Sequence, residues 1–248
     1  QKVRVSPQLN AGSVAVQHLF TKLHDRPAWE QALYGSGSGI VQTYTSMFGD
    51  PWERAAQAGP LFPDGVQLPQ LSLPFAPGEA WSLTGGAHIA WGVGSPRGAI
   101  DLAPVTGEKP CVVSRAWALA AAPGMVVRSE HSGVALDLDG DGREQTGLVL
   151  FYYHMAREER VRVGTLLPQD GRIGHPSCEG TRATGTHLHL TRKFNGEWLP
   201  LDGMLPFVMS GWTAHAGPRA YEGTLTRGDQ VVTAYPDGER GALIIREP

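Results

Sequence analysis

Short runs rich in apolar residues, separated by turn residues, fill the middle of the chain and predict β-strands. They lie at residues 124–128, 133–138, 147–154, 160–163 and 186–194. Turn signals separate the runs, at Pro123-Gly124, residues 139–142, Gly164 and Asp170-Gly171. Many short strands with regular turns between them predict a sheet that is mainly antiparallel.

The N-terminal part of the chain has a different pattern. Residues 14–33 carry apolar side chains at a loose helical spacing. Asp50-Pro51 reads as an N-cap followed by proline at the first helical position, and that helix should end before Gly59. A propeptide remnant or a binding element would fit this region, but packing against the rest of the protein is the interpretation we favour.

The C-terminal part contains three short possible strands, at residues 223–226, 230–234 and 242–246. We therefore expect an α+β protein that is mainly antiparallel β. The predicted division is a partly helical region at 1–70, a central domain at 71–212 and a β extension at 213–248.

Composition narrows the class of protein. A chain of 248 residues with 41% hydrophobic residues can bury a sizeable core, and 32 glycines with 19 prolines suit a loop-rich β protein. The net charge of −3 and the lack of a basic run argue against nucleic acid as a partner. No apolar run reaches the length of about 18 residues that a membrane span needs. The chain begins with Gln1, which suits a removed secretory signal.

The candidate chemistry begins at His187-Leu188-His189. Residues 186–191 alternate as a strand does, so His187 and His189 share one face and Leu188 and Leu190 share the other. Two buried imidazoles without partners are costly, and a metal ion would satisfy them. A surface strand with two solvated histidines is the alternative interpretation of this pattern taken alone.

Three more polar residues stand in unusual surroundings. His88 follows a glycine-rich approach, Asp101 lies between Ile100 and Leu102, and His154 ends the most hydrophobic strand. A carboxylate with apolar neighbours needs a partner, and a cation is the simplest one. Each residue alone suits an ordinary core or rim position, whereas together they are typical of a zinc site with an acid/base pair.

Four strings around these residues resemble the lysostaphin-like zinc metallopeptidases, which are peptidoglycan endopeptidases. The strings are Gly86-Ala87-His88, Ala99-Ile100-Asp101-Leu102-Ala103, Tyr152-Tyr153-His154-Met155 and Gly185-Thr186-His187-Leu188-His189-Leu190. The resemblance covers about residues 71–212. The long gap between His88 and Asp101 is more similar to the β-lytic and staphylolysin branch.

The resemblance implies a role for each of the five residues. His88, Asp101 and His189 would be the zinc ligands, and His154 and His187 the catalytic pair. Three protein ligands leave a fourth position open for water, as in catalytic zinc sites. Which histidine is the general base and which stabilises the oxyanion stays open. The implied activity is hydrolysis of cell-wall cross-links, with glycine-containing bonds expected.

The resemblance also bears on partners and location. It implies a secreted or cell-envelope protein, a peptidoglycan or glycine-rich peptide substrate, and a monomer. Export favours a disulfide between Cys111 and Cys178 over two free thiols. A non-catalytic wall-binding or regulatory protein of the same fold is the alternative function. All five polar residues are present, which favours the enzyme.

A separate acidic string, Asp137-Leu138-Asp139-Gly140-Asp141-Gly142, is similar to the front of a calcium loop. Leu148 stands at the twelfth position, where an EF-hand needs glutamate, so the EF-hand match fails. A different Ca²⁺ site at Asp137, Asp139 and Asp141 remains one interpretation. A polar hairpin turn is the other.

Overall fold

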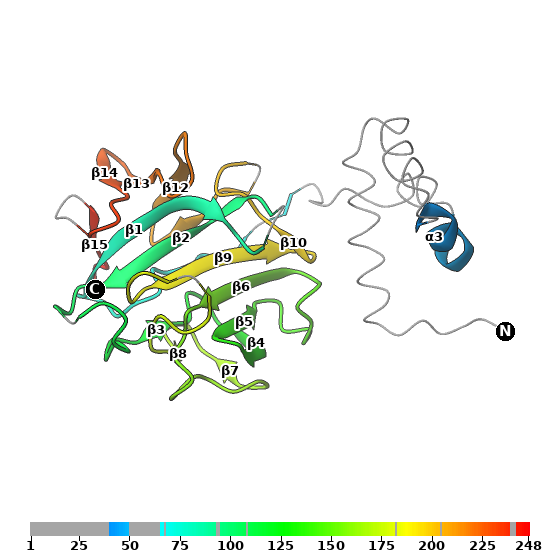
Figure 1. Ribbon diagram of the computed structural model, residues 1–248, viewed down its shortest axis with the longest axis horizontal. Helices are drawn as coiled ribbons and strands as arrows, with labels where there is room; N and C mark the ends of the chain where they lie inside the picture. The colour runs from blue at the N-terminus through cyan, green and yellow to red at the C-terminus, as the bar shows by residue number, and fades with distance from the viewer. Residues whose placement is uncertain are drawn as a thin grey trace. The chain divides into compact units, whose positions relative to one another are not determined.

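The protein divides into two compact units, residues 1–67 and residues 68–248. The computed structural model describes residues 40–49, 65, 66, 68–92, 95–107, 109–181, 183–203, 205–238 and 242–248. In the first unit it describes one helix, α3 (Ile40–Phe48), drawn in blue in Figure 1. The helices predicted from residues 14–33 and from Asp50 onward lie outside the described residues. Within the described ranges, no helix has both the length and the apolar character needed to cross a bilayer.

The second unit is built around a large antiparallel sheet. Its strands are β1 (Ala80–Ile89), β2 (Arg97–Pro104), β4 (Gly124–Glu130), β5 (Gly133–Asp137), β6 (Leu148–Tyr153), β7 (Leu166–Leu167), β9 (Leu188–Phe194), β10 (Glu197–Trp198) and β15 (Leu243–Ile245). They follow the order β15-β1-β2-β9-β6-β5-β4-β7, with β10 paired to β9 (Figure 1). The mainly antiparallel β fold predicted from the sequence is confirmed.

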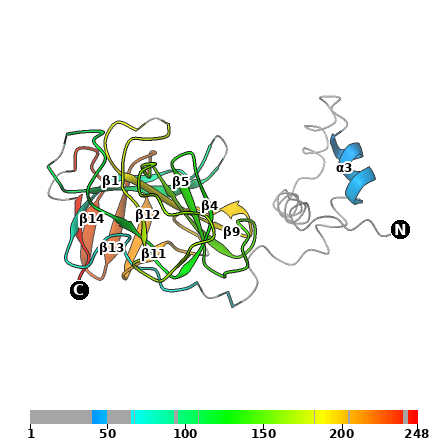
Figure 2. The ribbon, with the colours of Figure 1, turned by 90° about the horizontal axis from the view of Figure 1, so that it is seen from below.

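Two smaller sheets complete the unit. The first contains β11 (Val208–Met209), β12 (Trp212–Ala216), β13 (Gly223–Arg227) and β14 (Gln230–Thr233), which lie side by side in this order (Figure 2). The second pairs β3 (Ala118–Leu119) with β8 (Arg172–Gly174). The C-terminal stretch therefore contributes to two sheets, because β15 joins the large sheet beside β1.

Most predicted strands are present, but the one at residues 160–163 is wrong. Backbone at positive φ bounds this stretch, with Glu159 at 54° and Gly164 at 83°. Val161 N donates to Ile173 O at 2.9 Å, but this single bond does not make a strand of the stretch. Extended backbone cannot continue through residues in the left-handed region. The chain pairs with β4 slightly later instead, at β7.

The two faces of the large sheet bury different sets of side chains. Leu102, Leu188, Leu190 and Tyr152 belong to the main core. Phe151 and Tyr153 belong to a second cluster, which their alternation along β6 places on the opposite face. Asp101 and His189 alternate with core residues in the same way, so they lie on this second face. Asp101 and His189, two of the predicted metal ligands, therefore occupy the face that does not carry the main core.

Candidate metal centre

Three neighbouring strands bring His88, Asp101 and His189 together. Asp101 on β2 pairs directly with His189 on β9, and His88 on β1 pairs with Ala99, which lies on the same face of β2 as Asp101. Register shifts interrupt β1 on both sides of His88. Such bulges re-aim a side chain, and here the imidazole points towards the other two residues.

Gly85 makes room for the carboxylate. It pairs with Asp101, and a Cβ at this position would lie 2.5 Å from Asp101 Oδ2. Any side chain at residue 85 would displace the carboxylate from the centre. The glycine-rich approach to His88 thus has a steric function in the site.

Three candidate ligand atoms form a small triangle. The distance from His88 Nε2 to His189 Nδ1 is 2.9 Å, and Asp101 Oδ1 lies 3.2 Å from the former and 3.4 Å from the latter. All three side chains are buried. Zinc bonds of about 2.0–2.1 Å in tetrahedral geometry place neighbouring ligand atoms about 3.3–3.4 Å apart. The edges of the observed triangle, 2.9–3.4 Å, are close to this spacing.

The chemistry of these donor atoms also suits a cation. His88 Nδ1 is 2.8 Å from Gly86 O, and His189 Nε2 is 3.0 Å from Ala90 O. If these nitrogens carry the ring protons, then lone pairs of the other two nitrogens meet a carboxylate oxygen. Asp101 Oδ1 is buried and accepts no hydrogen bond of normal geometry from the described residues. A metal ion would satisfy all three atoms at once.

The pKa shifts of Asp101 and His88 both reflect the pairing of a carboxylate with positive charge. Burial raises the pKa of Asp101, but His189 and His88 outweigh it and hold the pKa well below its usual range. Burial lowers the pKa of His88, yet the contact with Asp101 and the bond to Gly86 O leave it raised. The cluster thus favours an ionised carboxylate and attracts positive charge.

The remaining two predicted residues, His154 and His187, lie beside this triangle. Their ring centroids are 4.5 Å apart, and His187 Nε2 is 3.6 Å from Asp101 Oδ1. Each ring directs its Nδ1 to a backbone carbonyl at 2.8 Å, Glu179 O for His154 and Gly185 O for His187. Burial and the charge of His187 lower the pKa of His154 to about 4, so this imidazole is neutral at neutral pH. The structure therefore brings all five predicted site residues together.

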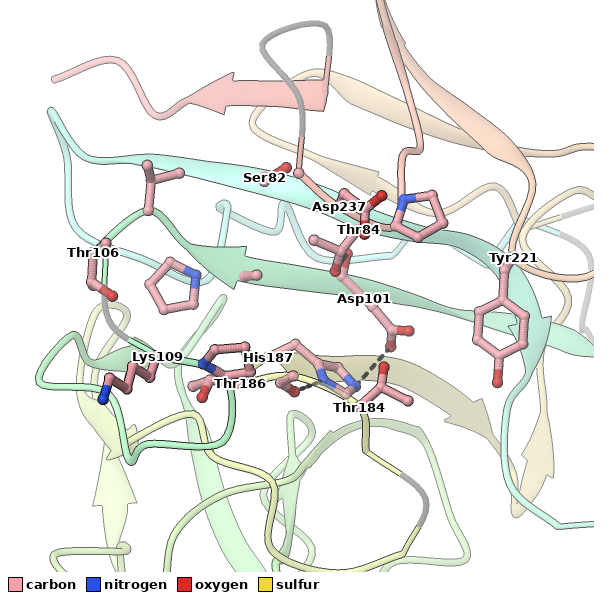
Figure 3. Close-up of a pocket in the computed structure, with 18 residues that line it drawn as sticks. Ser82, Thr84, Asp101, Thr106, Lys109, Thr184, Thr186, His187, Tyr221 and Asp237 are labelled. Atoms are coloured by element: carbon pink, nitrogen blue, oxygen red, sulfur yellow. Dashed lines mark hydrogen bonds and ion pairs between the residues drawn. The ribbon is translucent and has the colours of Figure 1, made fainter.

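Two lobes of one groove meet at the centre. One lobe, of about 740 Å³, runs past Thr84, Thr106 and Lys109. The other, of about 520 Å³, is lined by the four histidines with Trp91 and Tyr153. Figure 3 shows the first lobe, in which His187 faces Asp101 and Lys109 and Tyr221 lie on opposite sides. Since Asp101, Thr184, His187 and Tyr221 line both lobes, the groove passes across the centre.

Tyr221 is a site residue that the sequence pattern does not indicate. Its ring stacks on His88 with centroids 4.4 Å apart, and its backbone nitrogen and oxygen pair with Ala87 and Gly86 of β1. It lies in the connection between β12 and β13, over a hundred residues from its ring partner. No local pattern links positions so far apart, so only the fold could identify it.

The acidic string does not support the predicted calcium site. Asp137, Asp139 and Asp141 do lie close together. However, Asp137 accepts hydrogen bonds from the amides of Asp139, Gly140 and Gly142, and Asp139 accepts one from the amide of Asp141. Carboxylates that bond successive backbone amides are the mark of a polar turn. The hairpin-turn interpretation is therefore the better one.

The predicted disulfide between Cys111 and Cys178 is confirmed, with an S–S distance of 2.08 Å. It joins the segment after β2 to the segment that precedes His187. Both segments contribute residues to the first lobe of the groove.

Comparisons with known proteins identify the fold. The structure is similar to that of pseudoalterin, a deep-sea M23 metalloprotease, with a TM-score of 0.56 and 22% identity over 68% of this chain and 97% of that chain. A zinc-containing peptidase from Vibrio cholerae (TM-score 0.40, 17% identity, 56% of this chain and 41% of that chain) is more distant. So is the catalytic domain of lysostaphin from Staphylococcus simulans (TM-score 0.33, 19% identity, 50% and 88%).

No family model matches the sequence, and no curated protein matches it either. The fold assignment therefore rests on the likeness to pseudoalterin. The chain has the fold of the M23 metallopeptidases, the lysostaphin-like fold that its motifs led us to expect.

Proposed function

We propose that this protein is a zinc-dependent endopeptidase. One observation carries the proposal: three donor atoms within 3.4 Å of one another, with their lone pairs directed inwards, lie beside two further histidines in a groove. His88, Asp101 and His189 would hold the ion, which leaves a coordination position open as in catalytic sites. When bound, zinc supplies Lewis acidity, which polarises a carbonyl and makes water more acidic.

The second pair of histidines would handle protons. His154 and His187 each donate Nδ1–H to a carbonyl, so Nε2 is the atom free to take or give a proton. One of them would accept the proton of the attacking water and pass it to the leaving amine. The other would donate a hydrogen bond from Nε2 to the oxygen of the cleaved carbonyl only when it carries a second ring proton, that is, as an imidazolium. The assignment of the two roles stays open.

The groove favours cleavage within a chain. Its two lobes extend from the centre, so a peptide can continue on both sides of the cleaved bond. Short side chains line the walls, among them Thr181, Thr184, Gly185 and Thr186. Such walls let the backbone of a small-residue peptide approach closely, which supports glycine-containing bonds as the target.

The choice of peptidoglycan rests on the motifs around the five polar residues, which resemble those of peptidoglycan endopeptidases. We also propose an extracellular or cell-envelope location. The disulfide supports it, because such bonds persist in oxidising compartments.

The test is the release of new amino groups from purified peptidoglycans and from glycine-rich peptides, together with the zinc content per chain. We expect about one zinc per chain, and release that a chelator abolishes and added zinc restores. Mass spectrometry of the products would identify the bond. Zinc binding without release from any substrate would contradict the proposal and favour a non-catalytic wall-binding protein. Protein prepared without chelators that holds no zinc would refute the metal centre itself.

A further inference from the structure

A short segment lies between the two histidines to which the proposed function gives proton transfer. We call residues 176–180 the clamp segment. Its Ser177 forms an isolated β-bridge with His187, and its neighbour Pro176 forms one with Met155, which follows His154. The clamp segment therefore lies in backbone contact with both histidine-bearing parts of the chain.

Ser177 is the centre of these contacts. Its amide and its hydroxyl both donate to His154 O, at 2.8 Å and 2.7 Å, and its hydroxyl accepts a hydrogen bond from the amide of Glu179 at 3.0 Å. The amide of His187 donates to Ser177 O at 3.4 Å. Ser177 is only 1% exposed, so solvent cannot replace these bonds.

Glu179 completes the arrangement on the other side of His154. Its carbonyl accepts the bond from His154 Nδ1, and its carboxylate accepts one from the amide of Arg157. The carbonyl selects the tautomer of His154, and the hydroxyl of Ser177 fixes the turn that presents this carbonyl. His154 itself is at φ 65°, a strained backbone that needs surrounding contacts to persist.

The disulfide anchors the clamp segment from outside. Cys178 follows Ser177 directly and is joined to Cys111. Two hydrogen bonds strengthen this junction, from Ser114 N to Pro176 O at 2.9 Å and from Thr186 Oγ1 to Val112 O at 2.6 Å. Thr186 precedes His187, so both ends of the arrangement are attached to the segment around Cys111.

We infer that Ser177 and the Cys111–Cys178 disulfide are positioning residues, which hold His154 in one tautomer and keep His154 and His187 in register with each other. The inference rests on the proposed function for its effect on turnover, but not for its effect on the tautomer. The proposed metal ligands come from β1, β2 and β9, and the hydrogen bonds of His88 and His189 run to Gly86 O, to each other and to Ala90 O, not to the clamp segment. Substitutions that remove the bonds of the clamp segment should therefore impair proton transfer and leave zinc binding unchanged.

Two variants test this, Ser177→Ala and the double variant C111A/C178A. For each we expect kcat to fall about tenfold or more, since small displacements of catalytic groups cost up to about a hundredfold. KM should stay within about threefold, and zinc should remain at one per chain. Ser72→Ala is the matched control, because Ser72 is also buried and donates to a carbonyl, Ala121 O at 3.1 Å, among contacts that do not involve the centre. The control should keep its kcat.

Nitrogen NMR of the zinc-loaded protein gives a readout that does not depend on turnover. In the wild type we expect a single His154 tautomer with the proton on Nδ1, and in both variants a mixture of tautomers or a broadened signal. An unchanged tautomer with kcat within twofold of wild type would overturn the inference. So would loss of zinc from the variants, since the segment would then serve the metal centre.

If the wild type cleaves no substrate, the proposed function fails. The NMR measurement of the His154 tautomer still tests the inference in that case. A mixed tautomer in the variants would then support the positioning role, and an unchanged tautomer would overturn it.

Discussion

Each of the four histidines at the centre uses one ring nitrogen for a backbone carbonyl. The acceptors are Gly86 O, Glu179 O, Gly185 O and Ala90 O, at distances of 2.8–3.0 Å. A neutral imidazole has one donor and one acceptor nitrogen, so a donor fixed by the backbone directs the acceptor elsewhere. The backbone thus prepares the site before any ion binds.

The first prediction separates ligands from proton-transfer residues. His189→Ala should abolish zinc binding and activity, because it removes one of three ligand atoms. His154→Ala should keep zinc near one per chain and lose turnover by about a hundredfold or more. Metal analysis and steady-state kinetics on the same preparations check both. Near wild-type cleavage by the His154 variant would show that its assigned role is wrong.

The second prediction concerns Gly85. Gly85→Ala places a methyl group 2.5 Å from Asp101 Oδ2, so the carboxylate must move. We expect zinc affinity to fall about tenfold or more, as when an outer contact of a metal ligand is lost. Competition with a chelator measures it. Gly174→Ala is the control, since its nearest contact would be an ordinary 3.5 Å. Equal affinities for the two variants would contradict the steric argument.

At the scale of elements, the period of a strand separates stability from function. On β9, Leu188 and Leu190 enter the main core while His189 faces the site. On β2, Leu102 enters the main core while Asp101 faces the site. A one-residue slip in register would exchange the two faces. The apolar face therefore holds β2 and β9 in the register that brings Asp101 and His189 together.

A second feature at this scale is a half-buried ion-pair cluster that connects β4 with β9, two strands that are not neighbours in the sheet. Glu144, between β5 and β6, bonds Arg128 of β4 through two contacts of 2.7 Å and also pairs with Lys193 of β9. Arg128 lies over Phe151 and Lys193 over Trp198, at 4.8 Å and 4.4 Å. Burial raises the pKa of Glu144, but the two cations outweigh it and lower the pKa below its usual value.

The third prediction follows from this pKa. Glu144→Gln should reduce the free energy of unfolding by about 2 kcal/mol at neutral pH, the size of a hydrogen bond to a charged group. A carboxylate with a lowered folded pKa stabilises the protein above its unfolded pKa, and this stabilisation is lost as pH falls through the folded pKa. The difference between wild type and variant should therefore shrink below about pH 4.3, the ordinary value for glutamate.

Urea unfolding at several pH values measures this effect. Glu222→Gln is the control, because Glu222 pairs with Arg219 on the surface and should change stability little. A pH-independent difference for the Glu144 variant would show that packing, not charge, causes its effect.

At the scale of the whole molecule, residues 68–248 contain the complete centre and their own core. All five site residues and the disulfide belong to this unit. Both smaller sheets belong to it as well. The predicted boundary near residue 70 and the division at 212 stay predictions about domain organisation.

The fourth prediction is that residues 68–248 fold alone. A protein that begins at Leu68 should unfold in one cooperative transition, with a Tm within a few degrees of the full chain, and should bind one zinc. Calorimetry and metal analysis check this. A large loss of Tm would mean that residues 1–67 stabilise the second unit. A large gain in activity would mean that they restrain it.

Local pattern was enough to predict much of this protein. Short apolar runs between turn residues predicted β4, β5, β6 and β9 to within about two residues. This pattern missed β1, where Gly85-Gly86 interrupts the apolar run, and it missed β2 as well. It wrongly extended a strand through residues 160–163, because positive φ at Glu159 is a property of the folded backbone.

The sequence by itself singled out five polar residues through their local contexts and the resemblance of these motifs to a known family. It also predicted the disulfide, because the resemblance implies export, and the mainly antiparallel class, because apolar runs and turn residues are local signals. Only the tertiary structure decided that His88 and His189, 101 positions apart, place their nitrogens 2.9 Å from each other. It also decided which ring nitrogen faces inwards, where Tyr221 lies and how Ser177 holds His154. These depend on which strands pair and in what register, and pairing is set by the burial of the whole core.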